Sequence, residues 1–235
     1  MSEVGNEEGK EVVSETTTNS SSTNGAQSVS LTGIYAFKMG MSTLYNEKGD
    51  AVAVTILKQD NWIVSQVKTP ETDKYSAVQI SCQPKSTKNT TNSEKGHFKK
   101  IGERTFIHTK EIRQDNVSGI QVGQTVDIGS IKKGDIIRIS AQSKGRGFQG
   151  SVKRYGFAGG PAAHGSHFHR QPGSSGNRTW PGRVMPGKKF PGHMGDRQVT
   201  LKHVEVYDVL PEENVVIVKG PVPGAPNGLV RLMKE

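Results

Sequence analysis

Short runs rich in Val, Ile, Thr and aromatic residues recur along most of the chain, and turn-forming residues separate them. Within 51–57, Val52, Val54 and Ile56 alternate with small or polar neighbours, which is the period of a half-buried β-strand. Asn, Gly and Asp gather between runs, for example at 46–50, as tight turns require. The runs that predict strands in this part of the chain are 31–37, 51–57, 62–67, 75–82, 105–109, 125–128 and 135–139.

The same pattern returns near the C-terminus. Two apolar runs, 199–210 and 215–219, flank the turn residues 211–214 and predict a β-hairpin, and 229–233 predicts a last strand. Many short strands joined by tight turns are typical of an antiparallel barrel or sandwich. We therefore predict a mostly β protein whose barrel domain comprises residues 31–143 and 198–235. A polar, basic excursion at 85–104, with one short helix, lies on its surface.

Residues 144–197 interrupt the strand pattern. The segment has no Ile or Leu and only two valines, Val152 and Val184, while Gly and Pro recur throughout it. It cannot bury enough apolar surface to fold by itself, and its Gly and Pro residues preclude a long helix. Its single acid is Asp196, and its cations are Lys144, Arg146, Lys153, Arg154, Arg170, Arg178, Arg183, Lys188, Lys189 and Arg197. We predict a largely irregular basic arm, residues 144–197, whose shape is imposed by a polyanionic partner.

The first 30 residues have the opposite character. Glutamates outnumber the single cation, Lys10, and the stretch 16–30 is almost entirely polar, which predicts a disordered acidic tail for residues 1–30. No apolar run approaches the roughly 20 residues that span a bilayer, so we expect no membrane association. The single cysteine, Cys82, excludes an intrachain disulfide framework and a cysteine-based zinc cluster, and suits a reducing cytosol.

The first part of the arm contains a glycine motif. Residues 145–150 match G-x-G-x-x-G and follow a predicted strand. A dinucleotide-binding fingerprint also needs a following helix and an acid about 20 residues later, whereas 151–161 contains further Gly and Pro, and no acid precedes Asp196. We interpret the motif as a turn that exposes the backbone to nucleic-acid phosphates. A flexible hinge without a binding role is the alternative.

The arm carries few groups suited to catalysis. His164, His167 and His169 are potential metal ligands, but no Cys, Asp or Glu close to them in the sequence completes a site, so contacts to RNA are the favoured interpretation. The aromatic residues alternate with cations, as in proteins that stack on bases. We predict no catalytic site, no metal and no cofactor. The arm's aromatic residues are Phe148, Tyr155, Phe157, Phe168, Trp180 and Phe190.

Several motifs together resemble the universal large-subunit ribosomal protein L-three family, bacterial type. The most specific is Ser-Lys-Gly-Arg-Gly-Phe-Gln-Gly-Ser-Val-Lys-Arg at 143–154. The other motifs occur in the family's order and extend the resemblance over roughly residues 30–233. They lie at 35–41, 96–98, 172–176, 181–184, 195–200 and 218–224.

This resemblance implies a six-stranded barrel of the translation-protein type and a structural protein of the large ribosomal subunit in the cytoplasm. The implied partners are large-subunit rRNA and neighbouring ribosomal proteins, not further copies of the same chain. It also implies a role early in subunit assembly, with the arm tip, 173–177, directed towards the peptidyl transferase centre.

From the charge, the aromatic residues and the resemblance together, we expect a defined set of rRNA contacts. A free RNA-binding chaperone or translation factor, and a metal-dependent hydrolase that uses the three histidines, are the alternative functions. The expected contacts are Lys144, Arg146, Phe148, Lys153, Arg154, His164, His167, His169, Arg170, Asn177, Arg178, Trp180, Arg183, Lys188, Lys189 and Arg197.

Overall fold

The computed structural model describes residues 28–102 and 104–234. The acidic tail predicted for residues 1–30 therefore lies outside the described residues, apart from 28–30.

In the part of the chain that the structure describes, six strands close into an antiparallel barrel, which confirms the predicted fold class. In sequence order they are β2 (Gly33–Tyr45), β3 (Ala51–Lys58), β8 (Ile136–Gln142), β11 (Gln198–Leu210), β12 (Val215–Lys219) and β13 (Leu229–Lys234). Around the barrel the order is β11-β12-β3-β2-β13-β8, and each neighbouring pair is antiparallel.

Alternation of buried and exposed residues along the strands explains why the barrel has a filled interior. On β8, Ile137, Ile139 and Ala141 are buried, whereas Ile136 and Gln142 are exposed. Since successive side chains of a strand point to opposite faces, one face of each strand supplies the apolar interior. The other face of the same strands stays free to carry polar groups or to pack against a second layer.

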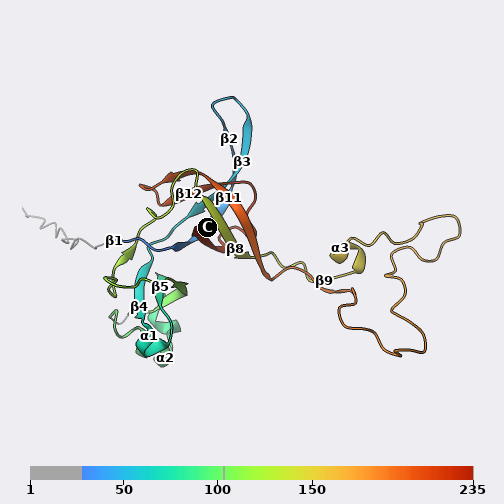
Figure 1. Ribbon diagram of the computed structural model, residues 1–235, viewed down its shortest axis with the longest axis horizontal. Coiled ribbons are helices and arrows are strands. Elements are labelled where there is room, and N and C mark those ends of the chain that lie inside the picture. The colour runs from blue at the N-terminus through green and yellow to red at the C-terminus, as the bar shows by residue number, and fades with distance from the viewer. Residues whose placement is uncertain (1–27, 103, 235) are drawn as a thin grey trace, which may run out of the picture.

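A second layer covers part of the barrel's outside. It is a five-stranded sheet in the order β1-β7-β4-β5-β6, and it lies below the barrel in Figure 1, with the short helices beside it. Its strands are β1 (Ser28–Val29), β4 (Ile63–Lys68), β5 (Ala77–Pro84), β6 (Phe106–Arg113) and β7 (Thr125–Val126), and its helices are α1 (Pro70–Asp73), η1 (Thr87–Asn89) and α2 (Asn92–Phe98).

The two layers share one hydrophobic cluster. The rings of Tyr35 on β2 and Trp62 lie 5.6 Å apart, and those of Phe37 and His108 on β6 lie 5.4 Å apart. The barrel domain predicted from the sequence, 31–143 and 198–235, includes the strand runs between 62 and 126. In the structure these runs pair with one another instead, and residues 77–82 of β5, which lies between β4 and β6, are buried throughout, as for a strand covered on both faces.

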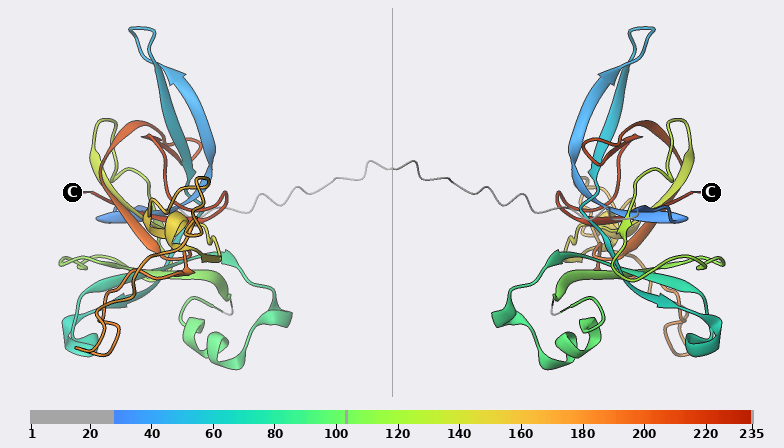
Figure 2. Two further views of the ribbon diagram at one scale, coloured as in Figure 1. Left: turned by 90° about the vertical axis from the view of Figure 1, so that its right-hand side faces the viewer. Right: turned by 90° about the vertical axis from the view of Figure 1, so that its left-hand side faces the viewer.

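Two elements project from this body. The β2–β3 hairpin rises away from the second sheet in both views of Figure 2, and residues 144–197 extend sideways from the barrel in Figure 1. Among the described residues, no helix combines the length and apolarity needed to cross a bilayer.

A half-buried ion pair stabilises the second sheet. Lys68 Nζ lies 2.6 Å from Glu111 Oε1, and the hydroxyl of Tyr75 donates a hydrogen bond of 3.0 Å to Glu111 Oε2. The hydrogen bond from Lys68, followed by that from Tyr75, lowers the pKa of Glu111, although partial burial opposes the shift. The same contacts raise the pKa of Lys68.

Glu111→Gln should therefore reduce stability in a pH-dependent way. A carboxyl whose pKa is lowered on folding contributes stability above its unfolded value of about 4.3, and this contribution fades as the pH falls through the folded value. In urea titrations, the difference in unfolding free energy between wild type and E111Q should be largest near neutral pH and shrink below about pH 4. Glu71→Gln on exposed α1 is the control, and a difference for E111Q that does not vary with pH would contradict the prediction.

Candidate nucleic-acid interface

The two ends of the arm leave the barrel side by side. Gln142, the last residue of β8, is the Cα partner of Gln198, the first residue of β11. One step further out, the amide of Ser143 donates to the carbonyl oxygen of Arg197 at 2.9 Å, and the Ser143 hydroxyl donates to the same oxygen at 3.0 Å. Pairing of β8 with β11 thus fixes both ends of the arm at one point on the barrel.

A narrow two-stranded stem continues outward from this point. The amide of Arg146 donates to the Met194 carbonyl at 2.9 Å, and the amide of Met194 donates to the Gly147 carbonyl at 3.0 Å. The strands β9 (Phe148–Gln149) and β10 (Gly192–His193) then pair antiparallel. At Gly195, whose φ is +77°, a Cβ atom would collide with the carbonyl oxygen of Lys144, so the stem needs glycine there.

The helix α3 (Ser151–Tyr155) follows the stem. The guanidinium of Arg154 donates to the Phe190 carbonyl at 2.7 Å and also lies over the ring of Tyr155, with 5.0 Å to its centroid. Lys189 lies over the same ring at 5.7 Å. Arg154 therefore ties the outgoing and returning chains of the arm together.

This helix bears on the interpretation of the glycine motif. A helix does follow Gly150, which the sequence analysis did not foresee, and the absence of Gly and Pro from 151–155 is the signal that could have indicated it. The dinucleotide fold requires a parallel βαβ unit, whereas β9 pairs antiparallel with β10. The structure thus offers no dinucleotide-binding unit at this motif.

Beyond the helix, the arm is an irregular loop. Residues 157–191, all of which the structure describes, form no helix or strand. One backbone hydrogen bond narrows the loop, from the Gly160 amide to the His169 carbonyl at 2.6 Å, where the ring of Phe168 packs against Gly160. Among the described residues of the arm, Ser151 alone is buried, and the hydrophobic core contains none of them.

The structure places nearly all of the predicted contact residues on the surface. Arg154 is the half-buried member of the set, and the others are exposed. Phe148 is 70% exposed and Trp180 is 84% exposed, so both rings present accessible faces. Tyr155 and Phe157 instead have ring contacts within the arm. Their rings lie 6.2 Å apart, and Tyr155 also contacts two cations.

The arm's positive charge is not neutralised within the chain. In residues 28–102 and 104–234, no cation of the arm forms an ion pair with a carboxylate. The arm's one acid, Asp196, accepts a hydrogen bond of 2.6 Å from the side-chain amide of Gln142. The described part of the chain also brings no three His, Cys, Asp or Glu side chains together as potential metal ligands, the arm histidines included.

Comparison with known proteins identifies the family. The family model for ribosomal protein L3 matches residues 111–214. Large ribosomal subunit protein uL3 of Bdellovibrio bacteriovorus is 59% identical over 206 residues, which cover 87% of this chain and 94% of that protein. The chain belongs to the ribosomal protein L3 family. The uL3 protein of Desulfotalea psychrophila is 45% identical, over 86% of this chain and 98% of its own length.

Membership of the ribosomal protein L3 family decides between the broad classes of function. The chain is a structural constituent of the ribosome and not an enzyme. The match of the L3 family model includes the whole arm as well as the barrel strands β8 and β11. The exposed arm is therefore the candidate nucleic-acid interface of this family member.

Substitution of Gly195 directly tests whether its close approach to Lys144 holds the stem of the arm together. Gly195→Ala and Gly147→Ala both place a side chain at positive φ, at a cost of about 1–2 kcal/mol each, but a Cβ on Gly147 meets no atom within 4 Å. G195A alone should separate the stem and remove the hydrogen-exchange protection of the Arg146 and Met194 amides. Equal protection of these amides in the two variants would show that the close approach at Gly195 does not hold the stem.

Proposed function

We propose that this protein binds large-subunit rRNA directly, chiefly through the arm. Two features of the arm together carry the proposal. Its ten cations have no carboxylate partner in the described chain, and none of its residues belongs to the hydrophobic core. A segment of this kind gains order from an external polyanion more readily than from its own contacts. The relatives from Bdellovibrio and Desulfotalea are named as proteins of the large ribosomal subunit.

The proposed mechanism is charge neutralisation combined with close packing. Lysine and arginine side chains offset the repulsion between phosphates of neighbouring RNA helices and release their counterions. The exposed rings of Phe148 and Trp180 can stack on unpaired bases. The stem and the tie made by Arg154 give the arm a fixed base, so the loop beyond them enters the RNA from a defined position.

The finer roles follow from this mode of binding. We propose that the arm tip, 173–177, reaches towards the peptidyl transferase centre and that the protein supports early assembly of the subunit. In this view the barrel contacts neighbouring ribosomal proteins as well as rRNA in the cytoplasmic ribosome. A free RNA chaperone or translation factor is the alternative, and sucrose-gradient fractionation separates the two, since a ribosomal protein sediments stoichiometrically with large subunits.

The mechanism predicts a strong salt dependence of RNA binding. For the full chain and a large-subunit rRNA transcript from Bdellovibrio bacteriovorus, a logarithmic plot of affinity against salt should have a slope of about −0.7 to −0.9 per phosphate neutralised. The triple variant Lys144→Gln, Arg146→Gln, Lys153→Gln should bind more weakly and with a shallower slope, because up to three phosphate contacts are lost. Filter binding across a salt series measures both quantities.

A matched control removes the same charge elsewhere. Lys48, Lys132 and Lys133 are exposed in turns of the barrel domain, and because the arm is the chief contact, their triple glutamine variant should lose less affinity and less slope than the arm variant. Binding by the wild-type protein that does not depend on salt would refute the mechanism. An equal loss in the two triple variants would show that net charge matters and the arm does not.

A further inference from the structure

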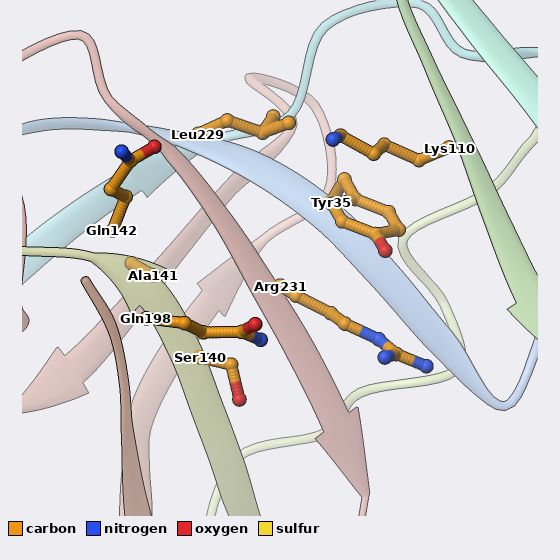
Figure 3. A pocket seen from close by; sticks show the side chains of 8 residues that line it. All are labelled: Tyr35, Lys110, Ser140, Ala141, Gln142, Gln198, Leu229 and Arg231. Atoms are coloured by element: carbon orange, nitrogen blue, oxygen red, sulfur yellow. The ribbon is translucent and has the colours of Figure 1, made fainter. Parts of the chain in front are cut away.

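A polar cavity lies between the barrel and the second sheet, beside the point where the arm leaves the barrel. It has a volume of about 350 Å³, within the range of about 300–1,000 Å³ that small-ligand sites occupy. Gln142 and Gln198, from which the arm departs, line one side of it, and Lys110 of β6 reaches in from the other (Figure 3). The cavity is thus continuous with the base of the arm.

The floor of the cavity is a row of polar side chains, Tyr35, Arg231 and Ser140, on the three neighbouring barrel strands β2, β13 and β8. Arg231 on β13 is the Cα partner of Tyr35 on β2 and of Ser140 on β8, and Ser140 is in turn the partner of Thr200 on β11. These positions alternate with the inward-pointing residues Val230 and Leu232. Strand register therefore places an arginine at the centre of the outer face, beneath the second sheet.

This arginine has donors without acceptors. The Nε atom of Arg231 is buried and has no hydrogen-bond partner among the described residues, and no ion pair in that part of the chain involves its guanidinium. Glu111, which is near enough to influence the titration of Tyr35, is engaged by Lys68 and Tyr75. A half-buried guanidinium without a counter-charge is costly, and an anionic ligand would remove that cost.

The surroundings favour a phosphate over other anions. None of the described side chains that line the cavity is a carboxylate, and Lys110 adds a second cation to Arg231. The planar guanidinium fork matches phosphate oxygens in a bidentate manner. The side-chain amide of Gln198 adds a hydrogen-bonding group of the kind that contacts bases and sugars, whereas the amide of Gln142 already donates to Asp196. Lys144, a cation of the arm, lies two residues beyond Gln142, so the cations of the arm begin immediately beyond the residues that line the cavity.

We propose that this cavity receives one nucleotide of the rRNA strand that follows the arm, with its phosphate held by Arg231 and with Lys110 supplying a second positive charge at the cavity. The inference rests on the proposed rRNA binding and adds to it a defined nucleotide site on the barrel. An acidic segment of a neighbouring protein could also satisfy Arg231, but the continuity with the basic arm favours RNA. The site gives the rRNA a second, rigid point of contact beside the irregular arm.

The test compares Arg231→Gln with Arg138→Gln in the full chain bound to the Bdellovibrio large-subunit rRNA transcript. Arg138 lies on β8 outside the cavity, and its guanidinium contacts the Met233 sulfur at 3.9 Å, so R138Q removes the same charge nearby. R231Q should bind about tenfold more weakly or worse, as loss of a charge-assisted hydrogen bond implies. Its salt slope should become shallower by about 0.7–0.9. Hydroxyl-radical footprinting should show one or two nucleotides that lose protection in R231Q while the protections that depend on the arm remain.

A second variant guards against a folding defect. Lys110 is exposed, so Lys110→Gln should leave thermal unfolding unchanged while it weakens protection of the same nucleotides. If R231Q and K110Q both match R138Q while the triple arm variant binds weakly, the cavity inference is wrong and the proposed function stands. If wild-type binding itself lacks salt dependence, both fail. Loss of a neighbouring protein from R231Q particles with unchanged rRNA protection would also overturn the inference, in favour of a protein ligand.

Discussion

Pairing of β8 with β11 is the constraint on which the rest of the structure depends. It closes the barrel, and it brings Gln142 and Gln198 together although the whole arm separates them in sequence. The entropic cost of closing a loop grows only with the logarithm of its length, so a stable barrel tolerates a long insertion at this position. Because the barrel holds both ends of the arm, the insertion leaves the body as a two-stranded stem instead of as two separate tails.

The insertion and the barrel are stabilised by different physical effects. The barrel and second sheet share one apolar cluster, with Trp62, Leu57 and Leu232 completely buried. The arm contributes nothing to that cluster, and few hydrogen bonds hold it beyond α3. Its unpaired cations repel one another in the free protein, and in the proposed function RNA phosphates relieve that repulsion. The proposed site at Arg231 has the same feature on the barrel, a cation without a counter-charge, because strand register places its unpaired guanidinium under the second sheet.

Features encoded by local pattern could be predicted from the sequence, and features created by long-range pairing could not. The alternation of 51–57 and the apolar run of 215–219 correspond closely to β3 and β12. The division of strands between barrel and second sheet depends on which strands pair, and β4, β5 and β6 contain Val and Ile as the barrel strands do. The high density of cations identifies the arm in the sequence, but α3 is too short for its residues to show a helical periodicity. Tyr35, Lys110 and Arg231 come together only through register and layer packing, so no spacing in the sequence revealed them.

The central claim is that the arm takes its shape from rRNA, and hydrogen exchange of its amides tests this most directly. In the free protein, amides of 157–191 should exchange at nearly the rate of an unfolded chain while barrel amides such as those of Ile139 and Leu232 stay protected. In the assembled large subunit, protection should spread over 157–191. Arm amides in the free protein that are as protected as those of the barrel would contradict the account.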